Sequence, residues 1–62
     1  MTVQNGNRKI EIEGSRRASE LLRSLGLNPE SHLVIVNGRL TTEDEVIPAD
    51  ANVKIIKVVS GG

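Results

Sequence analysis

The chain has 62 residues, enough for one compact domain and too few for a second. Eight basic and eight acidic residues give a formal net charge of zero, which argues against a nucleic acid or an anionic membrane as partner. There is no aromatic side chain for bases to stack on and no cysteine for a disulfide. The first residues lack a basic leader with an apolar stretch, and no apolar run could span a bilayer, so we expect a cytoplasmic protein.

The first elements are predicted to be two antiparallel strands. Asn5-Gly6 readily adopts the positive backbone angles of a tight hairpin turn. The segment 9–13 that follows alternates charged and apolar residues. Ile10 and Ile12 therefore share one face of the second strand, and the other face is left to water.

A short amphipathic helix is predicted next, over residues 15–26. Its apolar residues recur at helical spacing and form one stripe, made of Ala18, Leu21, Leu22 and Leu25. Ser15 is the expected N-cap, and Gly26 suits the left-handed position after the last turn, with Leu27 folding back onto the helix. A helix of this length needs to pack on a sheet to be stable.

The rest of the chain is predicted to add three strands. Residues 32–36 form an apolar, β-branched run, and Asn37-Gly38 then marks a second hairpin before a short strand at 39–41. A polar stretch leads to a last strand at 53–59. The order ββαβ(β)β predicts an α+β fold of the β-grasp type, a mixed sheet of four or five strands with one helix across it. We expect residues 1–59 to form this domain and residues 60–62 to form a flexible Ser-Gly-Gly tail.

One helix covers only one side of such a sheet. We expect Leu33 and Ile35, with Val53 and Ile55, to join the two isoleucines of the second strand beneath the helix. The other side would then expose four apolar residues as a partner surface, and these are Val34, Val36, Ile56 and Val58. Single exposed valines are common on any protein, so scattered surface residues remain the alternative.

The C-terminus is the feature that carries chemistry. A strand is followed directly by Ser60, Gly61, Gly62 and a free carboxylate. Glycine has no Cβ, so this segment can enter a slot too narrow for other residues. A carboxylate is a poor electrophile at neutral pH and needs activation, for example as an acyl-adenylate. The chain has no Gly-rich phosphate loop followed by lysine, so it is expected to bind no cofactor itself, and ATP would be used by a partner.

Nearly the whole chain resembles the prokaryotic ubiquitin-like β-grasp proteins. These are the small archaeal modifier proteins and the sulfur carriers of tRNA thiolation, thiamine synthesis and molybdopterin synthesis. The residues that carry the resemblance are Leu27-Asn28-Pro29, the run 34–39, Glu43-Asp44, Val53-Lys54-Ile55 and Gly61-Gly62. The stretch from Pro29 to Asp44 looks most like the archaeal modifiers. Molybdopterin carriers typically have aromatic and proline residues before the tail, where this chain has Ile56-Lys57-Val58-Val59.

The resemblance implies a protein co-substrate. Gly62 would supply the acyl group that an adenylyltransferase related to ubiquitin-activating enzymes converts to an adenylate, with Gly61 as its flexible neighbour. A sulfur donor would then give a thiocarboxylate for a sulfur-accepting enzyme, or a target lysine would form an isopeptide bond. Lys9, Lys54 and Lys57 could accept a second modifier, as could any exposed lysine.

A catalytic or metal site is not expected. His32 has no nucleophile or ligand beside it in the sequence, and Glu43, Asp44 and Glu45 read as a solvated loop. The alternative to a carrier is a stand-alone β-grasp interaction module in which the tail is incidental. A small RNA-binding β-grasp domain is a third reading, and the balanced charge and missing aromatics argue against it.

Overall fold

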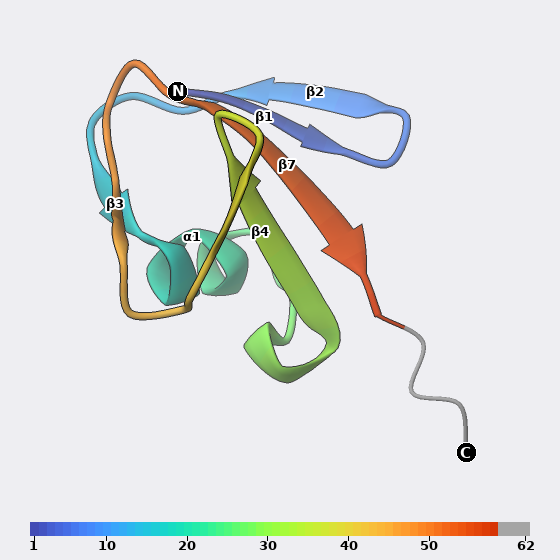
Figure 1. The fold of residues 1–62 in the computed structure, drawn as a ribbon. Coiled ribbons are helices and arrows are strands. Elements are labelled where there is room, and N and C mark those ends of the chain that lie inside the picture. Colours follow the sequence, from blue (N-terminus) through green and yellow to red (C-terminus); the bar gives the residue numbers. More distant parts are fainter. Residues whose placement is uncertain (59–62) are drawn as a thin grey trace.

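A computed structural model describes residues 1–58 (Figure 1). Its strands are β1 (Thr2–Asn5), β2 (Arg8–Glu11), β3 (Arg16–Arg17), β4 (His32–Val36), β5 (Arg39–Thr41), β6 (Val46–Ile47) and β7 (Asn52–Lys57). Its helices are α1 (Ala18–Ser24) and the one-turn 3-10 helix η1 (Pro29–Ser31). Five strands form one sheet in the order β2-β1-β7-β4-β5, and β3 pairs with β6 in a second, two-stranded sheet. The predicted α+β β-grasp arrangement is confirmed.

In the middle of the sheet, the last strand of the described chain lies beside the first. β7 lies between β1, to which it is parallel, and β4, to which it is antiparallel. A right-handed crossover through the single helix predicts this placement of the last strand beside the first. The edges of the sheet are β2 and β5, each the second strand of a hairpin.

Both predicted hairpins are present, with one shift of register. Asn37 and Gly38 both have positive φ, 51° and 83°, as a type I′ turn requires. In the first hairpin Asn5 pairs with Arg8, so the two turn residues are Gly6 and Asn7 rather than Asn5 and Gly6. Gly6 has a φ of 61°, which suits the first position of a type II′ turn.

The helix starts later than the sequence suggests. Ser15 is not its N-cap, because Arg16 and Arg17 pair with β6 and the helix begins only at Ala18. No side chain caps it. Instead, the backbone amides of Ala18 and Ser19 donate to the carbonyl oxygens of Glu45 and Glu43, each at 2.9 Å. Carbonyls of the acidic loop thus satisfy donors that a capping side chain would otherwise take.

The end of the helix is as predicted. Gly26 has a φ of 74°, its amide donates to the carbonyl of Arg23, and the amide of Leu27 donates to the carbonyl of Leu22 at 2.8 Å. These two bonds define a Schellman motif, in which the glycine takes the left-handed position.

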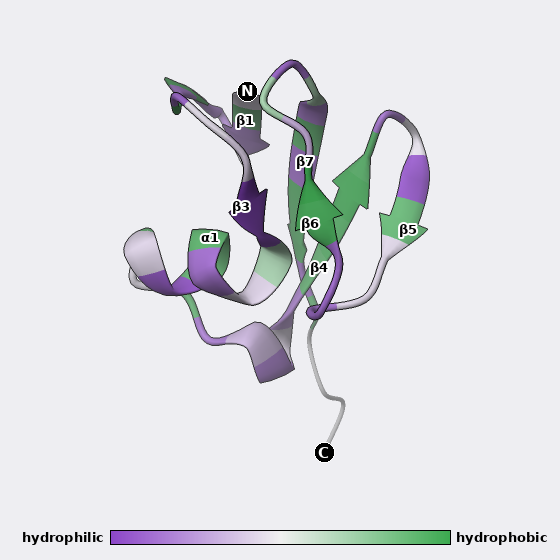
Figure 2. Cartoon of the chain, turned by 90° about the vertical axis from the view of Figure 1, so that its left-hand side faces the viewer, coloured by the Kyte–Doolittle hydropathy of each residue, from purple (hydrophilic) through white to green (hydrophobic). Residues whose placement is uncertain are grey.

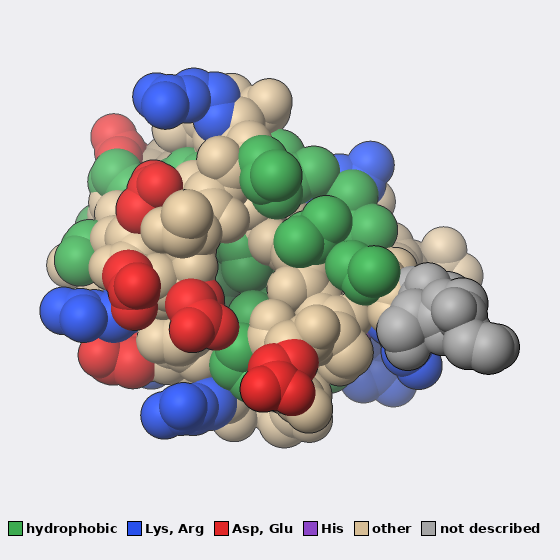
Figure 3. All heavy atoms as spheres, turned by 60° about the horizontal axis from the view of Figure 1, so that its bottom comes forward, with side chains coloured by type: hydrophobic (Ala, Val, Ile, Leu, Met, Phe, Trp, Pro, Cys, Tyr) green, Lys and Arg blue, Asp and Glu red, His purple; other side chains and the backbone are tan. Residues whose placement is uncertain are grey.

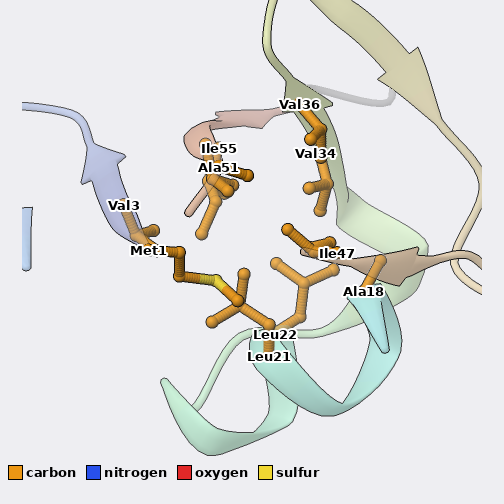
Figure 4. Packing of buried hydrophobic residues seen from close by; sticks show 11 residues of the cluster. Met1, Val3, Ala18, Leu21, Leu22, Val34, Val36, Ile47, Ala51 and Ile55 are labelled. Carbon is orange, nitrogen blue, oxygen red and sulfur yellow. The ribbon is translucent and has the colours of Figure 1, made fainter. Parts of the chain in front are cut away.

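The core lies between α1 and one face of the sheet (Figure 4). Its buried members are Met1, Val3, Ala18, Leu21, Leu22, Val34, Val36, Ile47, Ala51, Val53 and Ile55. Ile12 packs against them from the edge of the sheet. Val53 and Ile55 are therefore under the helix as expected, and Ile47 and Ala51 add core residues from a stretch that the sequence marks as polar loop.

The expected orientation of β4 is wrong. Val34 and Val36 are buried in the core, whereas Leu33 is 41% exposed and Ile35 is half-buried on the opposite face. The register explains the error, because Val34 lies opposite Ile55 and Leu33 lies opposite Ile56. Residues directly opposite in an antiparallel pair point to the same side of the sheet, so the side of β7 dictates the side of β4. Figure 2 shows that β4 is largely apolar, so its sequence does not indicate which of its two faces is buried.

Candidate functional site

The predicted site residues Gly61 and Gly62 lie outside the described residues, as does the predicted tail at 60–62. The structure does describe the strand that precedes these residues in the sequence. β7 ends at Lys57, at the opposite end of the strand from the chain's first residue (Figure 1). The amide of Val58 then donates to the carbonyl of Ser31 at 2.8 Å. Val58 is thus held beside η1, four residues before the end of the sequence.

An apolar surface lies on the face of the sheet away from α1. It shares Ile56 and Val58, both exposed as expected, with the predicted partner surface, but Val34 and Val36 are buried and the prediction that they belong to it is wrong. The residues of this sheet-face patch are Leu33, Ile35, Leu40, Ile56 and Val58. Figure 3 shows a group of apolar side chains on the right of the surface, whereas the acidic side chains lie on its left and in its centre.

The patch is built by strand pairing. Leu33 lies opposite Ile56, and Ile35 lies opposite Leu40, so three neighbouring strands present apolar side chains on one face. The exposed fractions of Leu40 and Val58 are 62% and 40%. Contiguous exposure of this kind is typical of a binding surface on a small protein.

The three candidate acceptor lysines are all exposed, and the structure separates them into two settings. Lys9 and Lys54 lie opposite Gln4 on β1, so they share the face of the patch. Lys54 also lies opposite Ile35 and lines a shallow depression on that face. Lys57 lies opposite His32, on the other side of the sheet. Their role as acceptors stays a prediction.

His32 and the acidic loop make hydrogen bonds within the fold, as expected of residues that support the structure. The Nδ1 atom of His32 is 2.9 Å from the carbonyl oxygen of Asn28 and 3.1 Å from the Oγ of Ser31. The loop from Glu43 to Glu45 supplies the two carbonyls at the start of α1. Within residues 1–58, no three His, Asp or Glu side chains come together as metal ligands. No helix of this part of the chain has the length and apolar character to cross a membrane.

Comparisons with known proteins agree with this fold. Residues 2–59 match the family model of small archaeal modifier protein 2. The sulfur carrier protein TtuB of Thermus thermophilus is 42% identical over 57 residues, which cover 89% of this chain and 85% of that protein. An uncharacterized protein of Archaeoglobus fulgidus is 37% identical over 54 residues, covering 87% of this chain and 78% of the relative. The resemblance drawn from the sequence is thereby confirmed, and the chain belongs to the small archaeal modifier protein 2 family of ubiquitin-like proteins.

Proposed function

We propose that this chain is a ubiquitin-like carrier whose Gly62 carboxylate is activated by an adenylyltransferase. The observation that carries the proposal is that Val58, whose amide donates to the Ser31 carbonyl, lies four residues before Gly62. Four extended residues span about 13–14 Å. Membership of the modifier family, and similarity to a relative named as a sulfur carrier, support the same chemistry.

The proposed activation is an acyl-adenylation. An oxygen of the Gly62 carboxylate attacks the α-phosphorus of ATP, a bond to AMP forms, and pyrophosphate leaves. The carboxylate is thereby turned into an electrophile with AMP as a good leaving group. ATP binding belongs to the partner enzyme in this proposal, because the chain has no Gly-rich phosphate loop followed by lysine.

Two fates of the adenylate follow from which nucleophile attacks it. A hydrosulfide ion displaces AMP and leaves a thiocarboxylate, with a C–S bond formed and the C–O bond to AMP broken. Alternatively, the neutral amine of a target lysine displaces AMP, loses a proton and gives an isopeptide bond. We propose sulfur delivery to tRNA thiolation or to cofactor synthesis for the first fate, and protein conjugation for the second, both in the cytoplasm.

The sheet-face patch is proposed as the surface that the activating enzyme contacts. Replacing Leu33 or Ile56 by Asp places a charge within the apolar contact, where it would lose water without gaining a partner. We expect the KM for the carrier to rise by about tenfold or more, corresponding to a loss of roughly 1.4 kcal/mol. The measurement is pyrophosphate release at varied carrier concentration.

Val46→Asp is the matched control for these variants. Val46 is 60% exposed but lies on β6, in the two-stranded sheet rather than in the patch. It is expected to keep the KM of the wild type. An equal rise in KM for all three variants would remove the patch from the proposal.

The function is tested by loading the purified chain. The chain is incubated with the adenylyltransferase of its own organism, ATP and sulfide, and its intact mass is measured. We expect a mass increase equal to the difference between sulfur and oxygen, dependent on ATP and located by fragmentation at Gly62. If neither a thiocarboxylate nor a lysine conjugate forms with the active enzyme, the proposed function is wrong.

A further inference from the structure

A shallow depression lies on the face of the sheet away from α1, beside the turn that joins β4 to β5. Lys54 is the one charged residue among its described lining residues, and Gln4, Asn37 and Asn52 add side-chain amides. Ile35 lines it as well and belongs to the sheet-face patch, so the depression adjoins that patch. The site therefore offers a positive charge and hydrogen-bond donors beside an apolar surface.

Strand pairing brings these side chains together. Gln4 on β1 lies opposite Lys54 on β7, and Lys54 lies opposite Ile35 on β4. Asn52 precedes Lys54 by two residues on β7, so both point to the same face of the sheet. The backbone amide of Asn37 donates to the carbonyl oxygen of Asn52 at 2.8 Å, which fixes the turn against β7. Three neighbouring strands and one turn thus build the depression.

The side chain of Asn37 has a defined orientation. Its Oδ1 atom accepts from the backbone amide of Asn52 at 3.0 Å. A backbone amide only donates, so the oxygen must face Asn52, and the Nδ2 atom keeps its two hydrogens for another acceptor. Within residues 1–58 the hydrogen bond of this side chain uses the oxygen alone. The turn therefore holds an exposed donor at the depression.

The charges around the depression are mainly positive. Lys9 lies opposite Gln4 on the same face, so a second ammonium stands two strands from Lys54, or about 10 Å. The carboxylate of Glu11 is on this face too, but it lies on the edge strand β2. Its Oε1 atom accepts from the Oγ1 of Thr2 at 2.6 Å. The local field at Lys54 thus favours an anionic group.

We propose that this depression receives an acidic side chain of the activating enzyme, with its carboxylate paired to the Lys54 ammonium and accepting from the Nδ2 of Asn37. The inference rests on the proposed function, because the partner is the enzyme that adenylates the chain. An apolar patch alone suits many partners, and a charge pair beside it selects one of them and sets its register. A free polyanion is a poorer fit, because one ammonium in an open depression neutralises little of its charge.

Replacing Asn37 by Asp tests the donor with almost no change of shape. Asn37→Asp keeps an oxygen for the Asn52 amide, and Asp-Gly suits a type I′ turn as Asn-Gly does. The other oxygen takes the place of Nδ2 and repels a carboxylate. We expect the KM for the chain to rise about tenfold at low ionic strength, with kcat unchanged at saturating carrier. Pyrophosphate release at varied carrier concentration measures both constants.

Replacing Lys54 tests the charge without touching the turn. Lys54 is exposed, so Lys54→Gln leaves the core intact, and we expect the KM to rise about fivefold. This difference should shrink as salt is added, because an open ion pair is screened. Lys54→Arg keeps the charge and should stay within about twofold of the wild type.

Arg39→Gln is the matched control for the loss of one positive charge. Arg39 is exposed on β5, but it lies opposite the buried Val36 and so on the other face of the sheet. It is expected to keep the KM of the wild type. An equal rise in KM for Arg39→Gln and Lys54→Gln would mean that only the total charge matters, and the depression would lose its role.

The remaining outcomes separate the inference from the function on which it rests. An adenylated wild type whose KM is unchanged or lowered by Asn37→Asp overturns the inference alone. Inorganic phosphate that by itself shifts the amide NMR signals of Asn37 and Asn52 would mark a site for a free anion and would also overturn it. A wild type that the enzyme does not adenylate overturns the proposed function, and the inference falls with it.

Discussion

Deleting Gly61 and Gly62 together is expected to abolish adenylation of the chain. The deletion moves the terminal carboxylate back by two residues, or about 7 Å, and places Ser60 at the end. A misplacement of about 1 Å can already cost 100-fold in rate, so kcat/KM should fall by at least about that factor. The fold should be unaffected, because the buried core lies within residues 1–55. Pyrophosphate release and the amide spectrum of the purified variant check both expectations.

Ser60→Gly is the control for this deletion, since it keeps both the length and the terminal glycine. It is expected to be activated like the wild type. The pair also separates the carrier from the alternative of a stand-alone interaction module. A module that binds through the sheet-face patch keeps its cellular function when the two glycines are removed, and that result would favour it over the carrier.

Replacing Leu21 by Ala is expected to unfold much of the protein at room temperature. Leu21 is fully buried, 0% exposed, between α1 and the sheet (Figure 4). Truncation of a buried leucine costs about 2–5 kcal/mol, and a domain of this size has only about 3–9 kcal/mol to lose. Alanine is a better helix former than leucine, so the loss would come from packing rather than from helix propensity. Urea denaturation followed by far-UV circular dichroism measures it.

Leu40→Ala makes the same chemical change at an exposed site. Leu40 is 62% exposed on the edge strand β5, so we expect a change of no more than about 0.5 kcal/mol. If the two variants had equal urea midpoints, the core described between α1 and the sheet would be wrong.

The two long strands show what a sequence can reveal about faces. In β7 the lysine at position 54 separates Val53 from Ile55, and this alternation predicted correctly which residues are buried. In β4 every residue from Leu33 to Val36 is apolar, so the pattern has no period and both orientations are equally consistent with it. Only the pairing of Val34 with Ile55 decides the orientation, and this pairing joins strands that are far apart in the sequence.

The start of the helix could not be predicted for a similar reason. A serine before an apolar stripe is a common N-cap signal, and Ser15 fits it. The signal fails because Arg16 and Arg17 pair with β6, and carbonyls of a distant loop take the first helix amides instead. Strands of two residues leave no periodicity in the sequence, so β3 and β6 were not predicted. The second hairpin turn and the end of the helix depend on local backbone angles at glycine and were predicted, whereas the first hairpin turn was predicted one residue too early.

In the candidate site, too, local features could be read from the sequence and long-range contacts could not. The terminal glycines are a local motif that is visible in the sequence itself, whereas their chemical role stays a prediction. The hydrogen bond from the Val58 amide to the Ser31 carbonyl could not be predicted, because the two residues lie 27 positions apart in the sequence. Asn28-Pro29 signals a turn and nothing about its partner.

The central place of β7 has a consequence for synthesis. Before this strand leaves the ribosome, the β1–β2 hairpin and the β4–β5 hairpin have no strand between them, and neither can complete the sheet alone. The nascent protein therefore becomes a folded domain only when its final strand emerges. A polypeptide broken off early would lack the strand on which the sheet depends, and it would stay unfolded.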